Sequence, residues 1–207
     1  NTTLDRVPED SLHAILVGYI RDSAIVAVVA AFIDRVRQCN PAVKVLIDPV
    51  MGDLDLGLYI PEEVSRLVCT ELVPRADICT PNVFEASVMS DCVKQPTATV
   101  LNELSQLDLP VKLATGIDLE APGDTVTTQV WSDGKAWKLT SPRVDIRPTG
   151  TGDLLSAAFL YVWLNTGSAT DALQSSVSIV HSLMVDAADR HLNELEPWRL
   201  HSLTETD

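Results

Sequence analysis

Residues 150–153 read Gly-Thr-Gly-Asp and stand directly before an apolar helical pattern. Glycines let successive backbone N–H groups turn toward one point, and a helix N-terminus adds partial positive charge. Gly150, Thr151 and Gly152 therefore form a candidate anion hole for a transferring phosphoryl group. Asp153 follows the hole, where its carboxylate can take the proton of an attacking hydroxyl, although the same residue can simply cap its helix.

Residues 48–53 read Asp-Pro-Val-Met-Gly-Asp and follow a buried-strand pattern. Proline and glycine favour a fixed turn, which we expect to direct Asp48 and Asp53 toward one crevice. Their carboxylates suit hydrated Mg²⁺, which prefers hard oxygen ligands, or they accept hydrogen bonds that stabilise the turn. Residue types alone leave both interpretations open.

Two more loops follow predicted strands. Residues 80–85 read Thr-Pro-Asn-Val-Phe-Glu, so Glu85 can reach the same metal and its waters, or Asn82 and Glu85 can form a capping box at a helix start. Thr115 and Gly116 leave room for a phosphate or a ribose, which is a weak signal by itself. The four loops together predict a site for phosphate chemistry.

Other nucleotide-binding motifs are missing from the sequence. The one Gly-Lys pair is Gly134-Lys135, and a Walker A loop needs glycine where Gln129 stands and Ser or Thr where Ala136 stands. The dinucleotide fingerprint fails because Leu155 occupies the position of its third glycine. The sequence therefore contains neither a P-loop nor the dinucleotide-binding fingerprint.

The chain has 207 residues, of which 46% are apolar, and a formal net charge of -14. Such a chain can bury a core, so we expect one globular domain over residues 1–207. The negative charge repels nucleic-acid phosphates and anionic lipid, so we expect no nucleic-acid and no membrane partner. No run of about 18 apolar residues is present. The four cysteines lack a C-x-x-C pair, which predicts buried, reduced thiols in a cytoplasmic protein.

Strand and helix patterns alternate along the chain and would place these loops. Residues 14–17 and 43–47 predict buried strands around a helix that begins at Asp22 or Ser23, and in such β-α-β units ligands bind at the carboxyl ends of the strands. The apolar stripe of that helix is expected to be Ile25, Val28, Val29, Phe32, Ile33 and Val36. We expect further helices over 61–72, from 82, and over 97–107, 153–164 and 169–188, with strands at 77–79 and 111–114 and a hairpin of 125–131 and 135–140.

With these motifs the chain resembles the ribokinase superfamily, and more closely its pyridoxal (vitamin B6) kinase branch. The resemblance is carried by Gly18-Tyr19, residues 48–53, Gly57-Leu58-Tyr59, residues 76–85 and residues 150–154. It implies an α/β fold, a doubly wound, mostly parallel sheet flanked by helices with late antiparallel strands. The Asp-Pro-Val-Met loop also resembles that of hydroxymethylpyrimidine kinase, which makes this enzyme the alternative.

The resemblance implies ATP-dependent phosphorylation of the 5′-hydroxymethyl group of pyridoxal, pyridoxine or pyridoxamine by a cytoplasmic homodimer. Asp153 would be the general base beside the anion hole. The other implied site residues are Asp48, Asp53 and Glu85 for Mg²⁺ or another divalent cation and its waters, Thr80, Thr115 and Gly116 along the ATP phosphates, Val144 near the base, and Gly18 and Tyr19 at the substrate. Carbonyls around Thr80 and Thr115 would accommodate a monovalent cation such as K⁺.

The sequence departs from the family pattern at three places. Arg21 replaces a small residue near the substrate side, and Gly116 replaces a commoner Ser beside the phosphates. The resemblance also begins part-way into the family pattern, so we expect a ribokinase-like domain that lacks its N-terminal strands. A non-catalytic B6-binding protein on the same fold is a further alternative.

Overall fold

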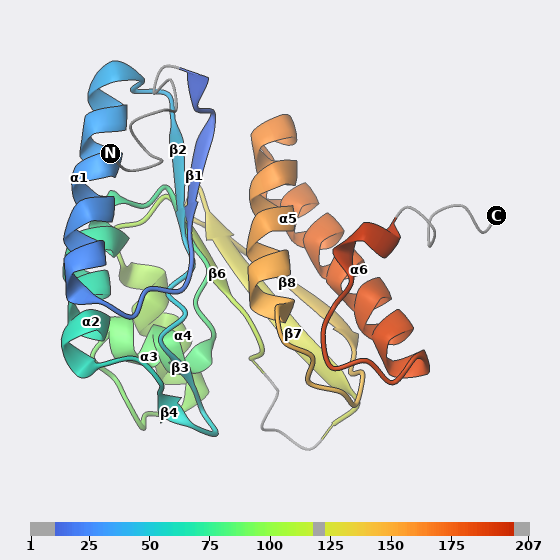
Figure 1. Cartoon of the computed structure of the whole chain (residues 1–207). Helices are drawn as coiled ribbons and strands as arrows, with labels where there is room; N and C mark the ends of the chain where they lie inside the picture. The colour runs from blue at the N-terminus through green and yellow to red at the C-terminus, as the bar shows by residue number, and fades with distance from the viewer. Residues whose placement is uncertain (1–10, 118–122, 201–207) are drawn as a thin grey trace. The chain divides into compact units, whose positions relative to one another are not determined.

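The computed structural model describes residues 11–117 and 123–200 (Figure 1). Its contacts divide the chain into two compact units, Asn1–Lys112 and Leu113–Asp207. The single domain expected over residues 1–207 stays a prediction. Within the described ranges, no helix combines the length and the apolar character needed to cross a membrane.

The first unit is built on parallel strands. β1 (Ala14–Val17) pairs with β2 (Lys44–Ile47) through the crossover helix α1 (Ser23–Cys39), β2 pairs with β5 (Ile78–Cys79), and β5 pairs with β6 (Val111–Ala114). Because β1, β2 and β5 pair in parallel, their carboxyl ends lie at one edge of the sheet. Three of the predicted site loops begin at that edge.

Helix α1 begins where the sequence predicts but buries a different face. The Asp22 carboxylate accepts a hydrogen bond from the Ala24 N–H at 2.8 Å and caps the helix. The buried residues are Val26, Ala30, Ile33 and Val36. Ile25 and Val28 are 48% and 49% exposed, so the predicted stripe was wrong on that side. Residues 24–33 of the helix are all apolar, so over this part its packing neighbours select the buried face.

The rest of the first unit differs in detail from the predicted pattern. The helix expected over 61–72 begins as α2 (Glu62–Leu67), continues as the π-helical turn η3 (Val68–Leu72) and ends in η4 (Val73–Arg75). The short antiparallel pair β3 (Gly52–Asp53) and β4 (Gly57–Leu58) was not predicted. The helices α3 (Val83–Met89) and α4 (Thr97–Gln106) begin within one residue of their expected positions.

The second unit combines a hairpin with two helices. β7 (Thr125–Ser132) and β8 (Lys135–Pro142) pair antiparallel around Asp133 and Gly134, whose φ angles of 51° and 70° form the left-handed turn that Asp-Gly predicts. In the strand order β7 and β8 follow β6. The helices α5 (Thr151–Thr166) and α6 (Ala169–Asp189) pack together, α6 also packs on the hairpin, and η5 (Pro197–Arg199) follows them.

Candidate active site

The loop after β2 is tightly held. The Asp48 N–H donates to the Val17 carbonyl at 2.8 Å, and the Asp48 side chain is buried. Asp53 Oδ1 accepts from the Leu56 N–H at 2.7 Å, so this carboxylate does stabilise its turn, as one of the two interpretations predicted. Any side chain at Gly52 would collide with the Gly57 carbonyl. Only glycine fits at this point of the loop.

Glu85 lies on the first turn of α3 and is 3% exposed. Its Oε2 accepts from the Asn82 N–H at 2.9 Å, while Asn82 Oδ1 accepts from the Glu85 N–H at 2.9 Å, which confirms the capping box. Its Oε1 accepts from the Met51 N–H at 2.8 Å. Burial raises the pKa of Glu85, and the backbone hydrogen bonds oppose that rise.

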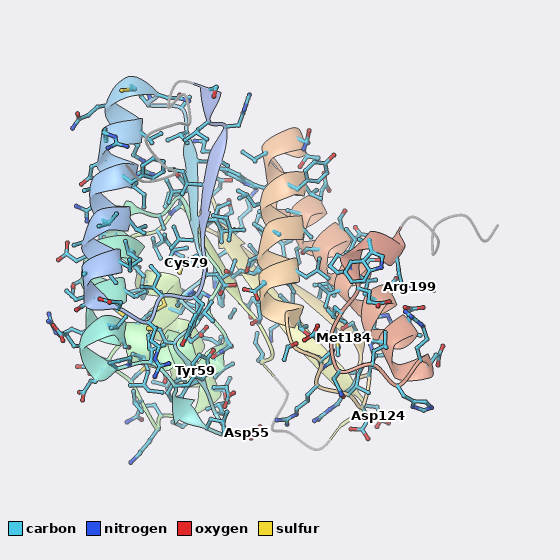
Figure 2. All side chains as sticks on the ribbon, in the orientation of Figure 1. Asp55, Tyr59, Cys79, Asp124, Met184 and Arg199 are labelled. Atoms are coloured by element: carbon cyan, nitrogen blue, oxygen red, sulfur yellow. The ribbon has the colours of Figure 1, made fainter. Side chains whose placement is uncertain are left out.

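Two acidic side chains, those of Asp48 and Glu85, lie near enough to the end of β5 to act on the Cys79 thiol. Burial raises the pKa of the Cys79 thiol well above its usual value, and the carboxylates of Asp48 and Glu85 add to the rise (Cys79 is labelled in Figure 2). Burial and Glu85 likewise raise the pKa of Cys69 to about 11. Both thiols are therefore protonated at neutral pH and are poor nucleophiles. Cys39 is exposed, so the prediction of buried thiols was wrong for that residue.

The described side chains include few groups that could together bind a metal ion. Across residues 11–117 and 123–200, no three His, Cys, Asp or Glu side chains are grouped so that they could hold a metal ion. Mg²⁺ usually keeps several waters and binds one or two carboxylates plus substrate phosphates, so Asp48 and Asp53 fit such a site without a third acid. The assignment of Asp48, Asp53 and Glu85 to a metal stays a prediction.

The loop before α5 is open. Gly150 has a φ of 85°, in the left-handed region that favours glycine, and its carbonyl accepts from the Leu154 N–H at 3.0 Å to start the helix. Gly150 has no side chain to cap the first turn, and Gly152 and Asp153 are exposed. The first-turn N–H groups are thus available to an anion. On its N-terminal side the loop is anchored by Thr149, whose N–H donates to the Asn193 carbonyl at 3.0 Å.

The remaining predicted residues divide between the two units. Thr80 is buried after β5, its N–H donating to the Ile47 carbonyl at 3.2 Å, and Tyr19 is 55% exposed after β1. In the second unit Gly116 has a φ of 64°, and the half-buried Val144 accepts from the Ile146 N–H at 2.8 Å. The structure therefore places Asp48, Asp53 and Glu85 in the segments that follow β2 and β5 of the first unit. It places the anion hole and Asp153 at the start of α5 in the second unit.

Sequence reasoning missed one role of Asn82. Its side-chain N–H₂ donates to the Gly52 carbonyl at 2.8 Å, across 30 residues of chain. The sequence signal at this position was only that of a helix cap. A hydrogen bond to a residue so distant in the chain produces no pattern in the sequence around Asn82.

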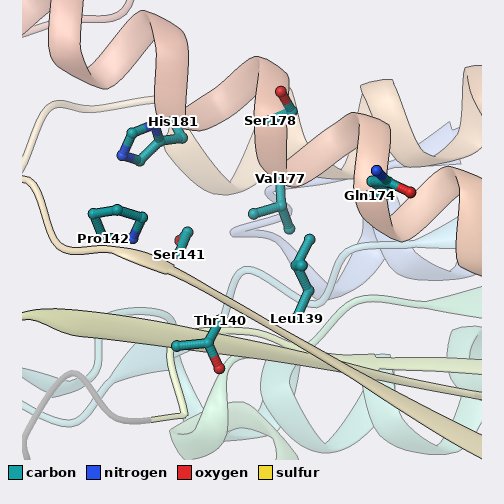
Figure 3. Close-up of a pocket in the computed structure, with 8 residues that line it drawn as sticks. All are labelled: Leu139, Thr140, Ser141, Pro142, Gln174, Val177, Ser178 and His181. Atoms are coloured by element: carbon teal, nitrogen blue, oxygen red, sulfur yellow. The ribbon is translucent and has the colours of Figure 1, made fainter.

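A pocket of about 230 Å³ lies between β8 and α6 (Figure 3). It is lined by Leu139, Thr140, Ser141, Pro142, Gln174, Val177, Ser178 and His181. None of the predicted site residues is among them, so this pocket is separate from the predicted chemistry.

The chain was compared with known proteins. A family model described as phosphomethylpyrimidine kinase matches residues 1–194. The chain belongs to the phosphomethylpyrimidine kinase family. This family member is 31% identical over 180 residues to the pyridoxal kinase PdxY of Deinococcus radiodurans, covering 82% of the chain and 60% of the relative. It is 35% identical over 170 residues to the pyridoxine/pyridoxal/pyridoxamine kinase of Bordetella avium, covering 80% of the chain and 57% of the relative.

The chain thus spans less than two thirds of the length of these two relatives. Among solved structures, the pyridoxal kinase from Leishmania donovani in complex with ADP and pyridoxamine matches with a TM-score of 0.81 at 24% identity, covering 95% of this chain and 72% of that one. This likeness confirms the predicted fold class, a mostly parallel sheet flanked by helices with late antiparallel strands. The names of the relatives confirm the predicted resemblance to pyridoxal kinases.

Proposed function

We propose that this chain carries the catalytic part of an ATP-dependent kinase that phosphorylates the 5′-hydroxymethyl group of pyridoxal, pyridoxine or pyridoxamine. The observation that carries the proposal is the uncapped start of α5, where a left-handed Gly150 opens the first-turn amides beside the exposed Asp153. An acid next to a free anion hole is what transfer of a phosphoryl group to an alcohol needs. The names of the family relatives supply the substrate class.

In the proposed reaction the substrate hydroxyl oxygen attacks the γ-phosphorus of ATP, and the bond from that phosphorus to the ADP oxygen breaks. Asp153 takes the hydroxyl proton. The N–H groups of Gly150, Thr151 and Gly152 stabilise the charge on the phosphoryl oxygens, so the rate comes mostly from positioning and electrostatics. Such a site tolerates the chain's net charge of -14, because it uses amides rather than a basic patch.

The remaining contacts of the proposal follow the family resemblance, except that Glu85 is not assigned to the metal, because backbone N–H groups engage both of its carboxylate oxygens. Bound Mg²⁺, or another divalent cation, would neutralise phosphate charge. Its waters would meet Asp48 and Asp53, and a monovalent cation such as K⁺ would lie near the carbonyls of Thr80 and Thr115. We assign Thr80, Thr115 and Gly116 to the ATP phosphates, Val144 to the base, and Gly18 and Tyr19 to the B6 vitamer.

The same resemblance supports two further parts of the proposal. These are a homodimeric assembly and a cytoplasmic location.

A substrate panel tests the proposed function. The full-length protein is assayed with ATP and Mg²⁺ against pyridoxal, pyridoxine, pyridoxamine and hydroxymethylpyrimidine, and formation of each phosphate is followed by chromatography. We expect turnover of at least one B6 vitamer with a kcat/KM well above that for hydroxymethylpyrimidine. The reverse preference would favour the alternative that the family description names, and nucleotide binding without any turnover would favour a non-catalytic binding protein.

A further inference from the structure

Glu85 has both carboxylate oxygens engaged by backbone N–H groups. Oε1 accepts from the Met51 N–H at 2.8 Å and lies 3.5 Å from the Gly52 N, and Oε2 accepts from the Asn82 N–H at 2.9 Å. Glu85 is 3% exposed and Met51 and Gly52 are buried as well, so no water can replace the carboxylate at the N–H groups of these two residues. A carboxylate that turned away to bind a metal would leave buried N–H groups without an acceptor, which proteins rarely tolerate.

Asn82 also binds this turn, through a backbone carbonyl rather than a backbone N–H group. Its Nδ2 donates to the Gly52 carbonyl at 2.8 Å, while its Oδ1 stays on the Glu85 N–H. The N–H of Met51 and both the N–H and the carbonyl of Gly52 are therefore tied to the first turn of α3. We call the pair of Asn82 and Glu85 the clasp.

Other contacts hold the side chain and the carbonyl of Met51, which the clasp does not bind. Met51 is fully buried, its Sδ accepts from the Ser65 hydroxyl at 3.1 Å, and its carbonyl accepts from the Tyr59 N–H at 3.1 Å. A Cβ on Gly52 would lie 2.5 Å from the Phe84 ring, so this stretch already packs directly on α3. Residues 51 and 52 are thus the fixed centre of a loop that carries Asp48 on one side and Asp53 on the other.

We propose that Asn82 and Glu85 are positioning residues, which hold the Met51–Gly52 turn so that Asp48 and Asp53 face the nucleotide, and that Glu85 does not itself bind the metal. The clasp follows from the contacts of the first unit alone. Only the statement about what Asp48 and Asp53 face rests on the proposed function.

Amide hydrogen exchange, measured by NMR on this chain without nucleotide, tests the clasp directly. Glu85→Gln offers one acceptor oxygen where glutamate offers two, so the N–H of Met51 or of Asn82 must lose its partner, and we expect about tenfold faster exchange there. Asn82→Ser keeps a helix-capping oxygen but loses the donor to the Gly52 carbonyl, and we expect about threefold faster exchange at Met51 and Gly52.

Ser168→Ala is the matched control, because Ser168 caps α6 by accepting from the Asp171 N–H in the second unit. It should leave the exchange of the Met51 and Gly52 amides unchanged. Unchanged exchange at these amides in both clasp variants would overturn the proposal, whether or not the protein proves to be a kinase. If Glu85→Gln fails to fold, Asn82→Ser carries the same test.

Calorimetric binding of ATP at several Mg²⁺ concentrations separates a positioning role from direct ligation. For positioning, both single variants weaken Mg²⁺-dependent binding by comparable factors of about three to ten, and the double variant is no weaker than Glu85→Gln, because both act on one turn. A loss above a hundredfold in Glu85→Gln with no loss in Asn82→Ser would make Glu85 a direct ligand and overturn the proposal. Absence of Mg²⁺–ATP binding in the unaltered protein would instead count against the proposed function, and the exchange result would still stand.

Discussion

The first-turn N–H groups of a helix have no acceptor within the helix. At the start of α3 side chains of this protein accept from them, whereas at the start of α5 no capping side chain does. At α3 the Asn82 side chain bonds the Glu85 N–H, and Glu85 bonds back to the Asn82 N–H. At α5 the cap is Gly150, which has no side chain to offer. A helix end that supplies its own acceptors serves architecture, whereas one without them can receive an external anion.

The acidic residues at these two helix starts also differ, in their exposure to solvent. Glu85 is 3% exposed and held by several backbone donors, whereas Asp153 is exposed on the surface of its unit. A carboxylate that exchanges protons with a substrate must be reachable, and one that positions a loop must not move. The comparison therefore supports the two proposals, that α5 carries the chemistry and that α3 holds a loop in place.

The largest effect should come from Asp153→Asn, which removes the proposed base but keeps the shape of the side chain. We expect kcat for pyridoxal to fall by about 100- to 10,000-fold, with little change in ATP affinity. Steady-state kinetics and calorimetry measure the two effects. Asp171→Asn is the matched control, because Asp171 is likewise the third residue of an exposed helix start, that of α6, and should keep full activity. An equal kcat for Asp153→Asn and the unaltered protein would remove Asp153 from the mechanism.

Thiol reactivity tests whether the α3 region is closed. With a pKa of about 11, Cys69 is only about one part in a thousand thiolate at pH 8, and it is half-buried, whereas Cys39 is exposed. We expect iodoacetamide to label Cys39 first and Cys69 far more slowly, with the rate at Cys69 rising as the pH approaches 11. Peptide mapping by mass spectrometry follows both sites. Comparable labelling of the two at pH 8 would mean that the region beside Glu85 is open.

The glycines of the two regions should respond differently to a methyl group. Gly52→Ala forces a collision with the Gly57 carbonyl and the Phe84 ring, and we expect it to lower the free energy of unfolding by about 1–3 kcal/mol. A Cβ at Gly152 meets no atom within 4 Å, so Gly152→Ala should change the stability by less than about 0.5 kcal/mol. Urea denaturation of both variants measures the contrast. Equal losses would show that the two loops are packed alike.

The smallest effect concerns the caps themselves. Asn82→Ala removes a capping acceptor and should cost about 1–2 kcal/mol of stability, while Ser168→Ala at the exposed start of α6 should cost about 0.5–1 kcal/mol. Thermal and urea unfolding provide the comparison. A cost for Asn82→Ala no larger than that for Ser168→Ala would indicate that the bond to the Gly52 carbonyl adds nothing to stability.

Local sequence patterns predicted the positions of many strands and helices. They failed where the structure depends on tertiary contacts. The strands at 14–17 and 111–114 and the Asp133-Gly134 hairpin have the expected places, because turn residues and short apolar runs act over a few positions. The predicted buried face of α1 was wrong at Ile25 and Val28, since residues 24–33 are all apolar and the packing neighbours select which of them are buried. The π-helical turn at Val68–Leu72 lies within a segment whose sequence pattern predicts only a helix.

The sequence by itself determined which residues are available for chemistry. Gly150, Gly152 and Asp153 stand together in the chain, so their association with a helix start follows from neighbouring positions. Only the tertiary structure revealed that this capping box is also bonded to the turn after β2, through Glu85 to the N–H groups of Met51 and Gly52 and through Asn82 to the Gly52 carbonyl. Those bonds join residues that are 30 to 34 positions apart in the chain, and such contacts exist only once the strands have brought the loops to one edge of the sheet.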